Sequence, residues 1–235
     1  MKYGVLGLAA LLGITSCGVP GRKPVEAAPV RPSQVSNFQQ LFSQNCSACH
    51  GPDGQGALTV GIGRPLYLAI ADDATMRRTI EEGRPGTAMA AFAKKAGGML
   101  TEAQIEILVR GLREHSAKPD AFKNEKPPPY ASSRPGDVTR GQQVFSELCS
   151  SCHGPDGRGE RAIADNAYLA LVSDQHLRTV IIVGMPNLGM PDWRDHGKPL
   201  SDADLTDVVA WLAAQRTPVL TQSQSTALSA RGGSQ

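Results

Sequence analysis

An eleven-residue segment occurs twice in this chain, as CSACHGPDGQG at positions 46–56 and as CSSCHGPDGRG at positions 149–159. The two copies match at nine positions, and each contains a Cys-x-x-Cys-His sequence. The similarity extends to LTEAQIEILVRGL at 100–112, which lies 100 residues before LSDADLTDVVAWL at 200–212. A repeat of this length is typical of a duplicated domain, so we expect two similar units rather than one large core.

Each repeat has the residue pattern of a small helical domain. Ile105, Leu108 and Leu112 recur at helical spacing, and Thr101 with Gln104 predicts a capping box ahead of them. No segment shows the convincing apolar–polar alternation of a strand, so the predicted fold class is all-α. The expected organisation is a signal peptide at 1–16, a flexible tether at 17–36, domains at 37–116 and 136–217, a Pro-rich linker at 117–135 and a disordered tail at 218–235.

The Cys-x-x-Cys-His sequence is the attachment motif of c-type haem. Two thiols separated by two residues on a helical turn can bond to the two vinyl groups of one porphyrin, and the adjacent histidine can then bind the iron from below. We therefore expect two covalently bound haem c groups. The candidate residues are Cys46, Cys49 and His50 for the first haem, and Cys149, Cys152 and His153 for the second.

Three other roles for these cysteines are less consistent with the spacing. A zinc site would usually place its second cysteine pair about 15–20 residues away, whereas these pairs lie 103 residues apart. A thioredoxin-like pair would need a strand before its helix, and none is expected here. A structural disulfide within one motif would not explain why a histidine follows it twice.

With these motifs, each unit resembles the small helical domain of the class I cytochrome c family. The resemblance implies that a downstream methionine binds the iron opposite the histidine. Met89 and Met190 are the methionines that align between the two units, each six residues after a glycine. In the family a proline usually follows this methionine; Pro191 follows Met190, whereas Ala90 follows Met89. The other candidates, Met76, Met99 and Met185, are expected in packing or at the surface, and His115, His176 and His196 have no aligned counterpart.

The resemblance also implies how the motif histidine is oriented. In the family, a proline after the motif orients this histidine through its backbone carbonyl. Pro65 occupies this place in the first unit, whereas the second unit has Asn166. We therefore expect the contact of His153 to differ from that of His50, and the two haems to be unequal.

The first and last helices of class I cytochromes pack a small residue against an aromatic one. Gly141 and Trp211 fit this pattern in the second unit, whereas Phe38 and Gly111 occupy the same places in the first. The large and small partners have exchanged helices, and cores tolerate exchanges that conserve volume. We predict that Phe38 stacks over Gly111.

The N-terminal sequence MKYGVLGLAALLGITSC resembles the signal peptide and lipobox of bacterial lipoproteins. Its apolar run is shorter than the roughly 20 residues that span a bilayer. The resemblance implies that Cys17 carries lipid and that the haem domains lie on the extracytoplasmic side of a bacterial envelope membrane.

The net charges of the chain and of its two domains indicate what kind of partner each could bind. The whole chain has a net charge of +2, which does not indicate nucleic acid. Residues 37–116 carry eight basic and eight acidic side chains, whereas residues 136–217 carry seven and eleven, a net charge of −4. We therefore hypothesise that the two domains dock different redox proteins.

The leading hypothesis is a membrane-tethered dihaem cytochrome that passes single electrons between envelope redox partners, such as those of a respiratory chain. This protein would be an electron carrier rather than an enzyme. Two alternatives stay open: a dihaem enzyme such as a peroxidase or a sulfur-compound dehydrogenase, and a haem subunit of a larger oxidase or dehydrogenase complex.

Overall fold

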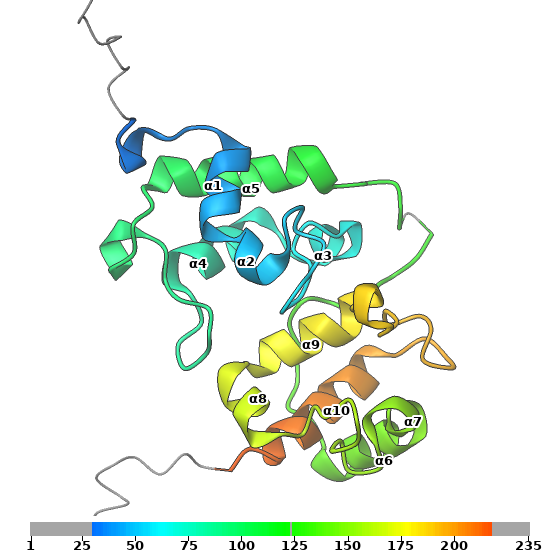
Figure 1. Cartoon of the computed structure of the whole chain (residues 1–235). Helices are drawn as coiled ribbons and strands as arrows, with labels where there is room; N and C mark the ends of the chain where they lie inside the picture. The colour runs from blue at the N-terminus through cyan, green and yellow to red at the C-terminus, as the bar shows by residue number, and fades with distance from the viewer. Residues whose placement is uncertain (1–29, 123, 218–235) are drawn as a thin grey trace, which may run out of the picture. The chain divides into compact units, whose positions relative to one another are not determined.

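The computed structural model describes residues 30–122 and 124–217, and within these ranges the secondary structure is helical, with no strand. Two isolated bridges pair Ala93 with Leu100 and Met185 with Met190. The all-α prediction is therefore confirmed (Figure 1). The helices are η1 (Pro32–Gln34), α1 (Phe38–Asn45), α2 (Ser47–His50), α3 (Pro65–Ile70), α4 (Asp73–Glu82), η2 (Lys94–Ala96), α5 (Glu102–Ser116), α6 (Val138–Leu148), α7 (Ser150–His153), α8 (Asn166–Leu171), α9 (Asp174–Val183), η3 (Pro186–Leu188) and α10 (Asp202–Ala214).

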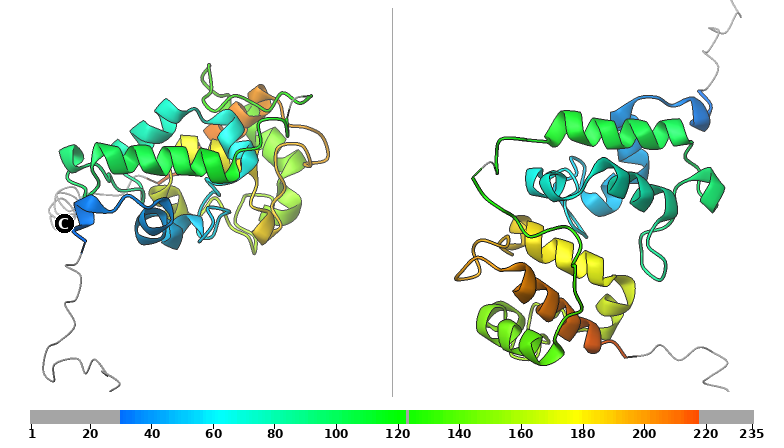
Figure 2. Two further views of the ribbon diagram at one scale, coloured as in Figure 1. Left: turned by 90° about the horizontal axis from the view of Figure 1, so that it is seen from above. Right: turned by 180° about the vertical axis from the view of Figure 1, so that it is seen from behind.

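In the first half of the chain, α1 crosses α5 (Figures 1 and 2). The crossing is close because Gly111 has no side chain: a Cβ built there would lie 2.2 Å from Cδ2 of Phe38. The ring of Phe38 also stacks on His115, in the last turn of α5, with 4.8 Å between ring centroids. The predicted packing of Phe38 over Gly111 is confirmed, as is the capping box of Thr101 and Gln104.

In the second half, α6 crosses α10, and the small residue lies on α6 instead. A Cβ at Gly141 would lie 1.9 Å from the carbonyl oxygen of Asp207 and 2.9 Å from Cβ of Trp211. The indole of Trp211 packs on Phe145, with ring centroids 4.3 Å apart. The two halves thus use the same helix crossing with the large and small residues exchanged.

The start of α10 is fastened to α6 by Asp204. Its carboxylate accepts hydrogen bonds from the Ser201 hydroxyl at 2.8 Å and from the Arg140 guanidinium at 2.9 Å. Burial acts to raise the pKa of Asp204, but these hydrogen bonds outweigh burial and hold it below its usual value.

The segments on either side of the first domain are also packed. Gln104 donates hydrogen bonds to the carbonyls of Pro32 and Val35, so the residues just before α1 lie against α5. The linker is held by α9: the buried guanidinium of Arg178, on that helix, donates hydrogen bonds to the carbonyls of the linker residues Pro129 and Tyr130. The linker therefore lies along α9.

Cys17, the expected signal peptide at 1–16 and the expected tail at 218–235 lie outside the described residues. Among the residues that the structure does describe, no helix is long and apolar enough to cross a membrane.

Candidate haem sites

Each Cys-x-x-Cys-His motif lies on a short helix that follows a longer one. Cys46 ends α1, and α2 (Ser47–His50) continues as one further turn that places His50 at its end. Cys149 and α7 (Ser150–His153) repeat this arrangement after α6. Residues three apart on a helical turn share one face, so the two cysteines of each motif project from the same side.

All four motif cysteines are free thiols. Burial raises the pKa of Cys46 to about 12 and that of Cys149 to about 11. Both thiols are therefore protonated at neutral pH in the chain alone. The described part of the chain also contains no group of three or more His, Cys, Asp or Glu residues placed to hold a metal ion.

The motif histidines are oriented by backbone carbonyls, but not by the residue that the sequence suggested. Nδ1 of His50 hydrogen bonds to the carbonyl oxygen of Val60 at 2.8 Å, and Nδ1 of His153 to that of Arg161 at 2.6 Å. With Nδ1 engaged, Nε2 of each ring is left free to act as an iron ligand.

The expected contact of His50 with Pro65 is therefore wrong, as is the expectation that the contact of His153 differs from that of His50. Pro65 instead begins α3, where its fixed backbone angle suits the first helical position. A backbone carbonyl is available at any residue, so the exchange of Pro65 for Asn166 leaves the orientation of the histidine unchanged.

Met89 and Met190 lie in matching loops after α4 and α9. The amide of Arg84 donates to the Met89 carbonyl at 2.8 Å, and the amide of Met185 donates to the Met190 carbonyl at 3.0 Å. Each loop starts from a glycine of positive φ, Gly83 in the first half. A Cβ at that glycine would lie 2.5 Å from backbone carbon of Ala90, so the loop closes where a side chain cannot fit.

In the first half, His50 and Met89 line the same cavity, which has a volume of about 370 Å³. Its walls are mainly apolar, and they include the buried side chains of Tyr67, Met76 and Leu112. Burial raises the pKa of Tyr67, which is neutral there. A cavity of this size with few polar groups is typical of a site for a cofactor or other small molecule.

Sequence reasoning missed part of this cavity wall. Tyr130 of the linker and Tyr168 and His176 of the second half line the same space. Oγ1 of Thr59 and Nδ1 of His176 lie 3.5 Å apart, and the Ala88 amide donates a hydrogen bond to the Leu171 carbonyl at 3.1 Å. No local pattern signals these residues, because they reach the cavity through long-range contacts.

His176 is neutral in this setting. Burial, together with the charge that His50 would carry, lowers the pKa of His176 to about 4. It lies on α9, whose other face contributes the buried residues Leu177 and Ile181 to the core of the second half.

The residues present fit haem in one further respect. Among the described side chains, three buried nitrogens have no hydrogen-bond partner: Nε of Arg64, Nε1 of Trp193 and Nε2 of His196. Buried polar nitrogens of this kind ordinarily have partners, and the carboxylates of a haem group are acceptors of the required kind. His196 lies close enough to His153 for a charge on His153 to lower its pKa, so His196 is near the second motif.

Each of the two helical units has a helix that leads into Cys-x-x-Cys-His, and in each a backbone carbonyl orients the histidine. These features define a tandem class I c-type cytochrome. The family model described as "Cytochrome C oxidase, cbb3-type, subunit III" matches residues 33–110 and again 136–212, and the chain belongs to this family.

Similar proteins include respiratory subunits. A "Cbb3-type cytochrome c oxidase subunit CcoP" of Azospirillum sp. (strain B510) is 31% identical over 144 residues, which cover 54% of this chain and 42% of that protein. A "Cytochrome bc1 complex cytochrome c subunit" of Mycobacterium tuberculosis (strain ATCC 25618 / H37Rv) is 26% identical over 219 residues, which cover 90% of this chain and 75% of that protein. The match thus spans less than half the length of the Azospirillum subunit.

A solved structure, that of the Kuenenia stuttgartiensis reducing HAO-like protein complex, has a TM-score of 0.47 and 20% sequence identity. The match covers 77% of this chain and 96% of that one.

Proposed function

We propose that this protein is a dihaem c-type cytochrome that passes single electrons between redox proteins of a bacterial envelope. The observation that carries the proposal is the pair of Cys-x-x-Cys-His turns whose histidines are oriented alike by Val60 and Arg161. Cys46 and Cys49 would attach the first haem, and Cys149 and Cys152 the second.

His50 with Met89, and His153 with Met190, would be the axial ligands. The cavity that contains both His50 and Met89 supports this pairing in the first half, and the matching Met190 loop supports it in the second. When bound, haem supplies an iron that alternates between the ferric and ferrous states. If a histidine and a methionine both held each iron, no position would be left for a substrate, and the chain would serve as a carrier.

The residues around the first haem have separate tasks in this proposal. The Val60 carbonyl holds the His50 ring and raises the basicity of its free nitrogen. Tyr67, Met76 and Leu112 keep water from the iron and provide a medium of low dielectric constant. Gly83 allows the tight loop that presents Met89.

The proposed partners are components of a respiratory chain, because the similar proteins are named as subunits of a cbb3-type oxidase and of a bc1 complex. A lipid-carrying Cys17 would hold the haem domains at the extracytoplasmic face of the membrane. Permanent membership of such a complex is a second candidate, favoured by the match over 90% of this chain.

Two measurements test the proposal. An electron carrier should show the methionine-to-iron charge-transfer band from both ferric haems, and the ferrous protein should not bind CO. Rapid binding of CO or cyanide at one haem would instead favour the enzyme alternative, with the Met89 haem as the first candidate since Ala90 replaces the usual proline. Purification from detergent-solubilised membranes would then separate a free carrier from a complex subunit.

A further inference from the structure

The first haem cavity contains a cation, Arg84, that the second unit lacks at the matching position. Arg84 follows Gly83 at the start of the Met89 loop, and its side chain lines the cavity. Its guanidinium is held in place: Nη2 donates to the Thr79 hydroxyl at 3.0 Å and to the Tyr130 hydroxyl at 2.9 Å. Both partners are neutral, and no ion pair within residues 30–122 and 124–217 joins Arg84 to a carboxylate.

The matching position in the second unit is Met185. The two residues have the same backbone role, because the amide of each donates to the carbonyl of the loop methionine. The residue that matches Thr79 is Val180, which is buried. At these positions the second unit therefore has neither the cation nor the hydroxyl group that would hold it.

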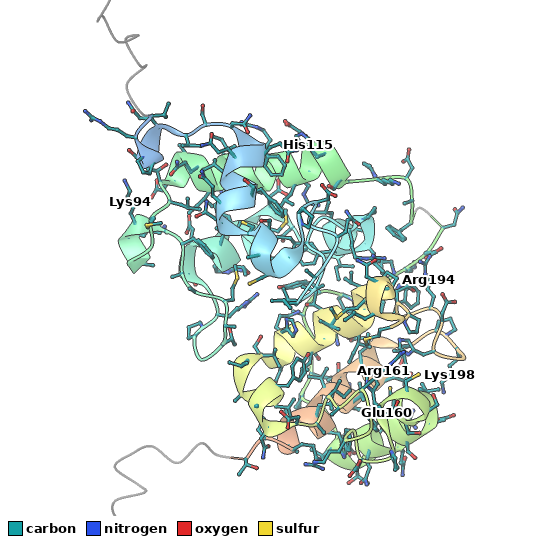
Figure 3. The ribbon with its side chains drawn as sticks, viewed as in Figure 1. Lys94, His115, Glu160, Arg161, Arg194 and Lys198 are labelled. Carbon is teal, nitrogen blue, oxygen red and sulfur yellow. The ribbon has the colours of Figure 1, made fainter. Side chains whose placement is uncertain are left out.

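A half-buried charge acts on a haem more strongly than an exposed one, because water and salt screen exposed charges. Arg84 is half-buried, and its side chain lines the first cavity. In the second unit, the Arg161 guanidinium lies near the Met190 loop, 3.6 Å from where a Cβ of Gly189 would be. Arg161 is exposed (Figure 3), and its domain has a net charge of −4.

We propose that Arg84 raises the reduction potential of the first haem above that of the second, so that an electron shared between the two haems rests mainly on the first. The inference rests on the proposed electron-carrier function. Ferric haem carries one more positive charge than ferrous haem, and a nearby cation therefore disfavours the ferric state. Loss of the cation should make the first haem easier to oxidise.

The test is a spectroscopic redox titration of the full chain with both haems bound. The wild-type protein should titrate in two waves, and Arg84→Met, which copies the second unit, should lower the higher wave and leave the lower one in place. We expect the partition of an electron between the two haems to shift about tenfold toward the second, which corresponds to ~59 mV for a one-electron couple. Arg84→Lys keeps the charge and should retain most of the wild-type separation.

Two further variants keep the proposal falsifiable if Arg84→Met binds haem poorly. Thr79→Val and Tyr130→Phe each remove one hydroxyl that holds the guanidinium, and each should lower the same wave by less than Arg84→Met does. The reciprocal Met185→Arg should raise the lower wave instead. The methionine-to-iron band serves as the control for intact ligation in every variant.

The inference is overturned if Arg84→Met leaves both waves unmoved, or moves the lower wave, while the methionine-to-iron band is retained. Failure of the proposed function would look different. The wild-type protein would then bind CO at a haem, or would lack two reversible one-electron waves, whatever residue stands at position 84.

Discussion

The contact of Phe38 with Gly111 yields a prediction whose size follows from the structure. In Gly111→Ala, the new methyl group would lie 2.2 Å from Cδ2 and 2.4 Å from Cγ of Phe38, well inside van der Waals contact. Either the ring must turn or α1 must move away from α5. Because α1 leads directly into the turn that bears Cys49 and His50, such a movement would reach the first haem site.

Two opposing effects set the magnitude. Alanine is the better helix former by about 1 kcal/mol, whereas overpacking of a close helix contact costs about 1–3 kcal/mol. We expect Gly111→Ala to destabilise the first domain by about 1 kcal/mol on balance. For a domain of this size, that corresponds to a melting temperature about 4–8 °C lower.

A double-mutant cycle separates this clash from other effects. Phe38→Ala is destabilising by itself, but it removes the ring that the new methyl group meets. In the Phe38→Ala background, Gly111→Ala should therefore become neutral or stabilising. Gly141→Ala is the matched control: its clash is with the Asp207 backbone in the other half, so its cost should be the same with or without Phe38.

The assay is thermal unfolding of the haem-loaded chain, followed by far-UV circular dichroism and by haem absorbance. Only the transition of the first domain should move in Gly111→Ala. An equal cost of Gly111→Ala in both backgrounds would refute the account of this contact, as would an unchanged melting temperature with intact haem absorbance.

Three further predictions concern the ligands, the acid stability and the charge. Met89→Ala and Met190→Ala should each open one axial position, so that one equivalent of CO binds to the ferrous protein; a variant that binds none would exclude that methionine as a ligand. The depressed pKa of Asp204 stabilises the folded chain above about pH 4, the ordinary pKa of an aspartate. This stabilisation is lost as the pH falls through the pKa of the folded state. Asp204→Asn should therefore be less stable than the wild-type protein at pH 7, and its free energy of unfolding should fall less on acidification. Identical acid-unfolding profiles would contradict this. The double variant Asp156→Asn with Glu160→Gln should slow electron exchange with a basic partner protein at low salt, and an equal rate there would count against docking through this acidic domain.

Much of the fold was predictable because its signals are local. Helical spacing and the capping box predict α5 from its own residues, and the same pattern recurs in the aligned segment of the second unit. The contact between Phe38 and Gly111 was also predictable, because the resemblance to class I cytochromes implies an aromatic–small pair between the first and last helices, and both units have one with the partners exchanged. The choice of Met89 and Met190 among the methionines followed from the alignment of the two units, in which each lies six residues after a glycine.

Other features of the site depend on contacts that have no local signature. The carbonyls of Val60 and Arg161 orient the histidines, and the residue type does not specify which carbonyl will do so. Tyr130 and His176 reach the first cavity from segments far along the chain, so neither periodicity nor spacing could assign them to it. Pairwise tertiary contacts of this kind need the folded chain.

The central claim is that each Cys-x-x-Cys-His turn attaches one haem. The most direct test is the haem content of the purified chain, measured by its pyridine haemochrome spectrum together with the intact mass under denaturing conditions. The account predicts two covalently attached haems in the wild-type protein, and one each in Cys46→Ser/Cys49→Ser and in Cys149→Ser/Cys152→Ser. A wild-type chain with one haem or none, or a haem lost on denaturation, would contradict it.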